Sequence, residues 1–120
     1  MYNKEKNNIL YLKSFEFALR IIKLSKYLKS KQKEYTISKQ VLRSGTSIGA
    51  NIKESMFAQS KKDFTSKLSI SLKEASETEY WLELLKSEYL KDELVDDLMF
   101  YLKQIMKLLI SSIKTSKLNS

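Results

Sequence analysis

The sequence has no proline, and its only glycines are Gly45 and Gly49. These two residue types most often mark turns, so their scarcity predicts few turns along the 120 residues. A β-sandwich or barrel of this length would need many more chain reversals. The composition therefore favours a handful of long helices, and the length fits one domain that spans residues 1–120.

Cysteine and histidine are also absent. Without cysteine the chain has no disulfides and no thiolate metal ligands, which agrees with a reducing cytoplasm, where we expect it to reside. Without histidine it lacks Ser-His-Asp and Cys-His arrangements and imidazole metal ligands. We therefore expect a binding protein rather than an enzyme, with no cofactor and no metal. A Ser-Lys dyad is the catalytic alternative that the composition leaves open, although nothing marks a particular pair.

Long hydrophobic runs are missing as well. No apolar stretch approaches 18 residues, and none follows the N-terminus in the manner of a signal peptide, so we expect neither a membrane span nor a membrane partner. Hydrophobic residues make up 42% of the chain and charged residues 30%. This balance is typical of a packed domain and not of a disordered chain.

Apolar residues recur at helical spacing in four segments, at about residues 9–29, 36–58, 61–88 and 92–114. The third segment is the clearest, because its apolar seam alternates steps of four and three over more than three heptads. That seam consists of Phe64, Leu68, Ser71, Ala75, Thr78, Leu82, Leu85 and Tyr89. The links between segments are short, so neighbouring helices should run antiparallel. We predict an all-α, up-down-up-down four-helix bundle.

The first segment carries two apolar rows, which flank a strip of small residues. One row comprises Leu12, Phe15, Leu19 and Ile22, and the other comprises Leu10, Phe17, Ile21, Leu24 and Leu28. One row closes the core of the bundle, whereas a second row left in solvent would be an uncommonly large apolar patch for a monomer. We therefore expect a homo-oligomer. The alternative is that both rows line a single wide core.

The second segment is the weakest of the four helices, because both glycines lie inside it and each costs roughly 1 kcal/mol relative to alanine. Three interpretations are open. The helix is kinked near the glycines, it breaks there and Ser44 or Ser47 caps a new helix, or the small side chains permit a close helix crossing.

The whole chain has a net charge of +8, and positive charge is concentrated in its first part. Residues 1–73 contain 16 Lys or Arg and 5 Asp or Glu, whereas residues 74–97 contain 2 and 9. Lysines neutralise phosphates without reading sequence, and the interleaved tyrosines can stack on unpaired bases. The predicted nucleic-acid contacts, from the outer face of the first helix, are Lys13, Arg20, Lys23 and Lys31. The alternatives are an ordinary solvated lysine face, or attraction between the two halves of neighbouring subunits.

Two carboxylates, Glu74 and Glu77, are three residues apart and therefore share one face of the third segment. Paired carboxylates bind metals in ferritin-like bundles, but those sites also use histidine. We expect the two carboxylates to pair with Arg43, Lys67 or Lys73, or with a neighbouring subunit, rather than with a metal.

Two stretches of the sequence resemble a known family. Residues 41–54 read VLRSGTSIGANIKE, and residues 68–78 read LSISLKEASET, followed by Trp81 and Leu82. Both are similar to the small bacterial four-helix bundle proteins encoded in 23S ribosomal RNA intervening sequences. The order and spacing extend over about residues 9–113. The family's usual glycine after the glutamate is replaced by Ser55, a minor departure.

The resemblance implies an up-down bundle that assembles as a ring, typically a pentamer, and it brings no catalytic residues. It extends to accessory proteins of diversity-generating retroelements, which are basic rings that bind nucleic acid and a reverse transcriptase. The matching motif positions are expected to be structural or interfacial, and they are Arg43, Ser44, Ser47, Asn51, Glu54, Glu74 and Glu77. The leading hypothesis is a homo-oligomeric RNA- or DNA-binding accessory protein. The second is a protein-interaction scaffold without nucleic acid.

Overall fold

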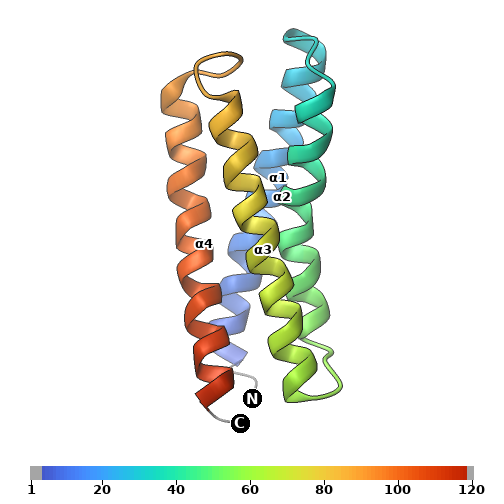
Figure 1. Cartoon of the computed structure of the whole chain (residues 1–120), viewed down its shortest axis with the longest axis vertical. Coiled ribbons are helices and arrows are strands. Elements are labelled where there is room, and N and C mark those ends of the chain that lie inside the picture. Colours follow the sequence, from blue (N-terminus) through green and yellow to red (C-terminus); the bar gives the residue numbers. More distant parts are fainter. Residues whose placement is uncertain (1–3, 119–120) are drawn as a thin grey trace.

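The computed structural model describes residues 4–118, with side chains from Asn8 onward. Over these residues the chain forms α1 (Lys4–Lys31), α2 (Thr36–Ser55), α3 (Lys61–Leu85) and α4 (Asp92–Leu118). The helices run alternately up and down, and each contacts its two neighbours around the bundle (Figure 1). The predicted all-α four-helix bundle is confirmed. None of the helices within residues 4–118 combines the length and apolar character that crossing a bilayer requires.

The apolar seam of α3 is buried from Phe64 to Leu85, as its heptad spacing predicts. The prediction is wrong only for Tyr89, because α3 ends at Leu85. Tyr89 lies in the α3–α4 connection, where it is exposed. The turn includes Ser87, whose φ of 71° places its backbone in the left-handed region, and this reverses the chain before α4 begins.

Helix α2 is continuous through both glycines, so the break with a new cap at Ser44 or Ser47 does not occur. The glycines instead allow α1 to approach closely. A Cβ atom on Gly45 would lie 2.9 Å from Cγ2 of Ile21, and one on Gly49 would lie 3.1 Å from Oγ of Ser14. The close-crossing interpretation therefore holds, and the strip of small residues on α1 lies against α2.

Hydroxyl groups join α2 to its neighbours inside the core. Thr78 donates to Oγ of Ser44 at 2.9 Å, and Ser71 donates to the carbonyl of Ile48 at 2.9 Å. Ser38 donates to the carbonyl of Ser25 on α1 at 3.1 Å. Each of these buried hydroxyls therefore has a partner, which avoids the penalty of an unpaired polar group.

Ser112 on α4 is different, because its Oγ is buried and has no hydrogen-bond partner among the described residues. An unpaired buried hydroxyl costs about 1–3 kcal/mol, and alanine is also a better helix former than serine. We predict that Ser112→Ala raises the free energy of unfolding by roughly 1 kcal/mol. Urea unfolding monitored by circular dichroism tests this. A loss of stability would show that the hydroxyl has an ordered partner.

The connection between α1 and α2 buries its one carboxylate. Glu34 accepts hydrogen bonds from the backbone N–H groups of Ile37 at 3.1 Å and Ser38 at 2.7 Å, so it satisfies the free amides at the start of α2. Lys33, with φ of 55°, turns the chain so that the Glu34 amide reaches the carbonyl of Leu28 at 3.0 Å. The end of the bundle formed by α1 and α2 therefore exposes lysines while its carboxylate faces inward.

Candidate nucleic-acid interface

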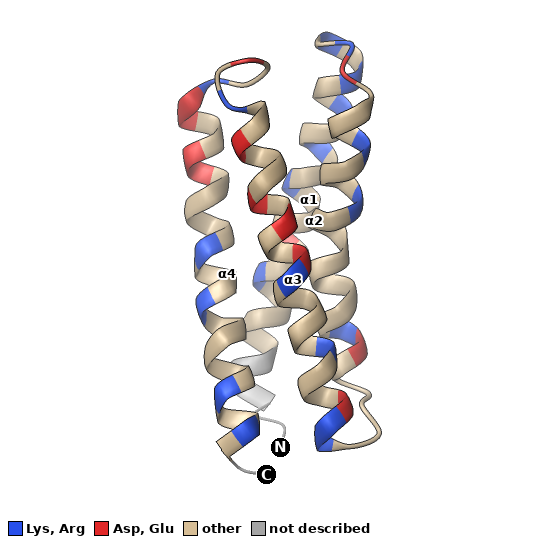
Figure 2. Ribbon diagram, in the orientation of Figure 1, with Lys and Arg blue, Asp and Glu red and all other residues tan. Residues whose placement is uncertain are grey.

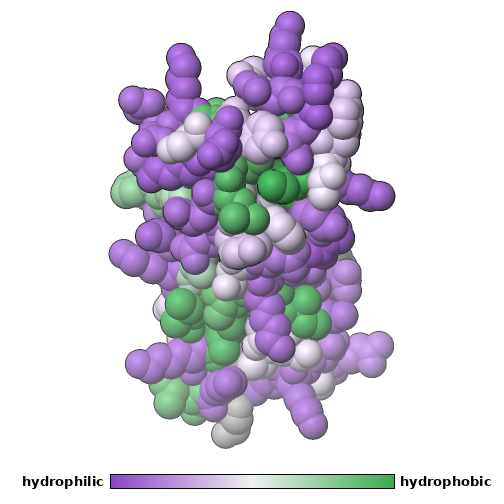
Figure 3. Space-filling view, turned by 45° about the horizontal axis from the view of Figure 1, so that its top comes forward, coloured by the Kyte–Doolittle hydropathy of each residue, from purple (hydrophilic) through white to green (hydrophobic). Residues whose placement is uncertain are grey.

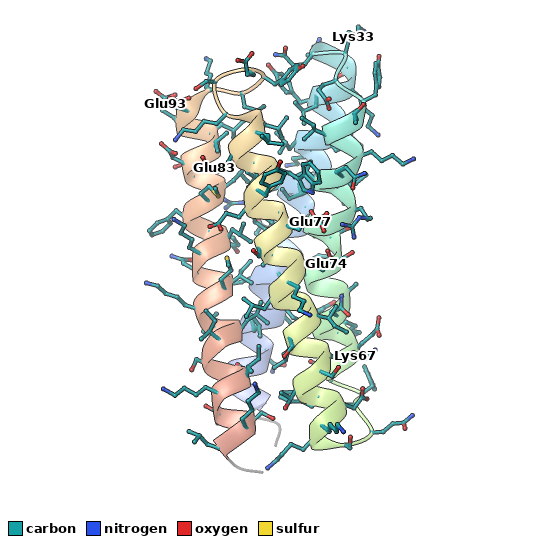
Figure 4. All side chains as sticks on the ribbon, in the orientation of Figure 1. Lys33, Lys67, Glu74, Glu77, Glu83 and Glu93 are labelled. Carbon is teal, nitrogen blue, oxygen red and sulfur yellow. The ribbon has the colours of Figure 1, made fainter. Side chains whose placement is uncertain are left out.

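Charge is segregated at the end of the bundle where α1 meets α2 and α3 meets α4. The α1–α2 side is basic, and its exposed lysines are Lys23, Lys26, Lys29, Lys31, Lys33 and Lys39. The α3–α4 side is acidic, and its exposed carboxylates are Glu83, Glu88, Asp92, Glu93, Asp96 and Asp97. Figure 2 shows the two groups beside each other at the upper end of the molecule, and Figure 4 labels Lys33 and Glu93 on opposite sides of this end. We call the lysine group the basic end.

The four predicted phosphate contacts divide into two pairs. Lys23 and Lys31 are exposed members of the basic end. Lys13 and Arg20 instead turn toward α4, where Lys13 Nζ donates to Oε1 of Gln104 at 3.2 Å. Both therefore line the border between α1 and α4, where Arg20 is exposed and Lys13 is half-buried.

At this border Tyr101 on α4 contacts both cations of α1. The Arg20 guanidinium carbon lies 4.5 Å from the Tyr101 ring centroid and the Lys13 ammonium lies 5.3 Å from it, both within cation–π range. The same ring stacks on Phe17, with centroids 6.2 Å apart and planes at 8°. Burial raises the pKa of the Tyr101 phenol, so the ring stays neutral at physiological pH. Arg20 Nε is also 3.6 Å from the Glu16 carboxylate, which orients the guanidinium further.

The outer face of α1 carries apolar side chains as well as lysines. Of the two predicted rows, the row containing Phe17 and Ile21 is buried in the core. The other row stays in solvent, with Leu12 64% exposed, Phe15 52% and Leu19 43%. We call these three residues the α1 stripe. Figure 3 shows several apolar patches between hydrophilic side chains on the face that it views.

A cleft of about 430 Å³ lies between α1 and the start of α4. Leucines from both helices line it, and charged groups and one tyrosine stand around it. Its lining residues are Arg20, Lys23, Leu24, Tyr27, Leu90, Lys91, Leu94, Asp97 and Leu98. It contains two of the predicted phosphate contacts, Arg20 and Lys23. We call it the α1–α4 cleft.

A second cleft, of about 560 Å³, lies at the opposite end of the bundle, where α3 begins and α4 ends (Figure 1). Its lining is cationic and hydroxylic, and comprises Lys61, Lys62, Thr65, Ser66, Ser69 and Lys117. It suits a phosphate, because ammonium and hydroxyl groups both donate hydrogen bonds to anionic oxygen. Among the described residues its lining includes no aromatic side chain and no leucine.

Glu74 and Glu77 both bind Arg43 on α2. Arg43 Nη1 lies 3.2 Å from Glu74 Oε2, and Nη2 donates to Glu77. Trp81 Nε1 also donates to Glu77, at 2.9 Å. The hydrogen bond from Trp81 and the Arg43 guanidinium both lower the pKa of Glu77. The hydrogen bond that Arg43 donates to Glu77 raises the pKa of Arg43. Figure 4 shows both carboxylates on the side of α3 that faces α2, so the cluster connects these two helices at the surface.

The other motif residues also act within the fold. Ser47 donates to the carbonyl of Arg43 at 2.7 Å, and Asn51 donates to the carbonyl of Ser47 at 2.9 Å, so both bond along α2 itself. Glu54 pairs with Lys67 of α3 at 3.0 Å. Among the described side chains there is no cluster of three Asp or Glu that could hold a metal ion. The motif therefore supports α2 and its contact with α3.

These features define a class of protein: an antiparallel helical bundle with a basic end and an exposed apolar stripe. The model of the 23S rRNA-intervening sequence protein family matches residues 6–111, and the chain belongs to that family. It is also similar to the crystal structure of a protein with unknown function from the S23 ribosomal protein family of Bacteroides thetaiotaomicron VPI-5482. The TM-score is 0.89 and the sequence identity 56%, over 91% of this chain and 98% of that chain. No curated protein matches the chain.

Proposed function

We propose that this chain is a non-catalytic, homo-oligomeric bundle that binds RNA as an accessory protein of the 23S rRNA intervening-sequence type. The basic end carries the proposal. Six exposed lysines are gathered there, and the only carboxylate of the α1–α2 connection is buried against the start of α2. A cationic surface of this kind attracts the phosphate backbone and releases its counterions.

Self-assembly is the second part of the proposal. The α1 stripe leaves three large apolar side chains in solvent along two turns of one helix. Such a row costs free energy when hydrated, and burying it against a second copy removes that cost. The family resemblance makes a closed ring of five subunits the expected assembly. A ring also repeats the basic end around an axis, which raises its effective affinity for a long polyanion.

A protein-interaction scaffold is the alternative function. It is favoured by the acidic carboxylates of the α3–α4 side, which lie beside the basic end and would repel a nucleic acid that extended over them. They suit a basic partner protein. By family resemblance, one such partner is a reverse transcriptase.

A filter-binding titration against RNA at increasing salt separates the two functions. Nucleic-acid binding predicts a dissociation constant that rises linearly with salt on logarithmic axes, because phosphate contacts release counterions. A Lys29→Gln, Lys31→Gln, Lys33→Gln variant should weaken binding and flatten the slope. The matched control is Lys103→Gln, Lys107→Gln, which removes exposed lysines of α4 that lie outside the basic end. Absent or salt-insensitive RNA affinity would exclude the RNA-binding function and favour the scaffold.

A further inference from the structure

We propose that the α1–α4 cleft receives an unpaired base of a bound single-stranded nucleic acid, while the cations at its rim hold the adjoining phosphates. This inference rests on the proposed nucleic-acid binding and assigns it a site and a preferred ligand form. Three properties of the cleft support the assignment: its apolar floor, the tyrosine at its mouth and the charge of its rim.

The floor of the cleft is built from leucines of both helices. Leu24 of α1, Leu90 of the α3–α4 connection and Leu98 of α4 are buried, whereas Leu94 is 44% exposed and forms an open wall. A volume of about 430 Å³ lies within the usual range of small-molecule sites, which runs from about 300 to 1,000 Å³. A flat heterocyclic base therefore has both the room to enter and an apolar surface to cover.

Tyr27 supplies an aromatic surface beside this floor. Its side chain is 43% exposed, and its phenol oxygen accepts a hydrogen bond from Gln32 Nε2 at 3.1 Å, which restrains the ring. Aromatic side chains bind unpaired bases by stacking, and this tolerates any base because every base has a π-face. A duplex presents its bases already paired and stacked, so it offers no free face to Tyr27.

The rim of the cleft selects an anion. Arg20, Lys23 and Lys91 line it, against the single carboxylate of Asp97. Arg20 is held over Tyr101 and beside Glu16, so its guanidinium is positioned before a ligand arrives. A ligand that joins a flat ring to an anionic group on its edge matches this arrangement, and a nucleotide is such a ligand. Asp97 can additionally accept a hydrogen bond from an exocyclic amino group of the base.

The second cleft makes a useful contrast. Its lysines, Lys61, Lys62 and Lys117, and its hydroxyls can bind phosphate, but its described lining includes no ring or leucine to receive a base. It therefore should not distinguish single strands from duplexes. Only the α1–α4 cleft combines phosphate-binding and base-binding groups among the clefts described above.

Fluorescence anisotropy with labelled 12-nucleotide RNA tests the assignment, with the same sequence as a single strand, as a duplex and as DNA. We expect the single strand to bind at least tenfold more tightly than the duplex. Tyr27→Ser should weaken single-strand binding about tenfold, as the loss of one stacked base implies, and leave duplex binding unchanged. Lys91→Gln should weaken single-strand binding severalfold. The matched controls are Tyr35→Ser, an exposed tyrosine outside the cleft, and Lys103→Gln. Each variant is first checked for wild-type helicity and melting temperature.

The outcomes separate this inference from the proposed function. Equal binding of single strand and duplex, or single-strand binding that Tyr27→Ser and Lys91→Gln leave at the wild-type level, overturns the cleft assignment while salt-dependent nucleic-acid binding stands. Binding of no nucleic acid overturns both. Selective loss of single-strand binding in Tyr27→Ser and Lys91→Gln, with both controls unaffected, supports the assignment. The DNA strand then shows whether the 2′-hydroxyl contributes.

Discussion

Replacing Gly45 with leucine should lower the free energy of unfolding by about 3 kcal/mol, the upper part of the usual range for overpacking a core. A Cβ atom at this position would lie 2.9 Å from Cγ2, 3.0 Å from Cγ1 and 3.3 Å from Cβ of Ile21. Ile21 is fully buried and β-branched, so it has no free space and few rotamers into which it can move. The longer leucine side chain therefore has to push α1 and α2 apart along the bundle.

Gly49→Ala is the matched control for this prediction. Its new Cβ would meet only Oγ of Ser14 at 3.1 Å, with the next atom of Ser14 at 3.5 Å. A hydroxyl can rotate away, and alanine gains up to about 1 kcal/mol of helix propensity over glycine. The stability of Gly49→Ala should therefore equal or exceed that of the wild type in urea unfolding at one protein concentration. Adding Ile21→Ala should partly restore Gly45→Leu. A fully stable Gly45→Leu protein would mean that the two helices do not cross closely.

Placing charges on the α1 stripe should dissociate the assembly. In a Leu12→Glu, Leu19→Glu variant, two carboxylates would be buried without partners at the proposed subunit interface, and each costs several kcal/mol. Every 1.4 kcal/mol is a factor of ten, so association should weaken by roughly a thousandfold or more. Both side chains are exposed in the single chain, so folding itself should be preserved. Light scattering after size-exclusion chromatography should therefore give the 14.1 kDa of one folded chain.

The control for the stripe variant is Phe57→Glu. Phe57 is also exposed and apolar, but it lies in the connection between α2 and α3 and is not a member of the α1 stripe. It should keep the wild-type mass, which shows that the effect belongs to the stripe and not to any added charge. Circular dichroism and thermal melting distinguish a dissociated chain from an unfolded one. A stripe variant that keeps both its helicity and the wild-type mass would place the interface elsewhere.

The helices could be predicted from sequence because their information is local. The seam of α3 from Phe64 to Leu85 repeats at heptad spacing, and that spacing alone identifies the buried face. Two rows on α1 were equally visible, but the sequence does not say which row is buried. That choice depends on where α2 and α4 lie, and only the structure shows that the Leu12 row remains outside.

The candidate site was only partly predictable, because it forms between segments far apart in the chain. Lys13 and Arg20 are two turns apart and share a face of α1, which the sequence does show. Their attraction to Tyr101, more than 80 positions away, is not visible in any local pattern. Lys91 lines the α1–α4 cleft, and no local pattern in the sequence indicates this position.

The ion-pair partners of the motif residues were likewise not predictable from the sequence alone. The carboxylates Glu74 and Glu77 had three candidate cations in the sequence, and spacing could not choose among them. In the structure both carboxylates form ion pairs with Arg43, because α2 packs against α3 at this position. Lys67 instead pairs with Glu54. Partner choice is set by the register of two packed helices, which a single sequence without its fold does not specify.

Sedimentation velocity of a fluorescent single-stranded RNA mixed with the wild-type protein tests the central claim most directly, since it reads assembly and binding together. A self-assembled nucleic-acid-binding bundle predicts that, at low salt, the label moves with a species about five times the 14.1 kDa of one chain plus the RNA. At high salt the label should return to the rate of free RNA. RNA that sediments at its own rate at every salt concentration, or with only a single chain, would contradict the account.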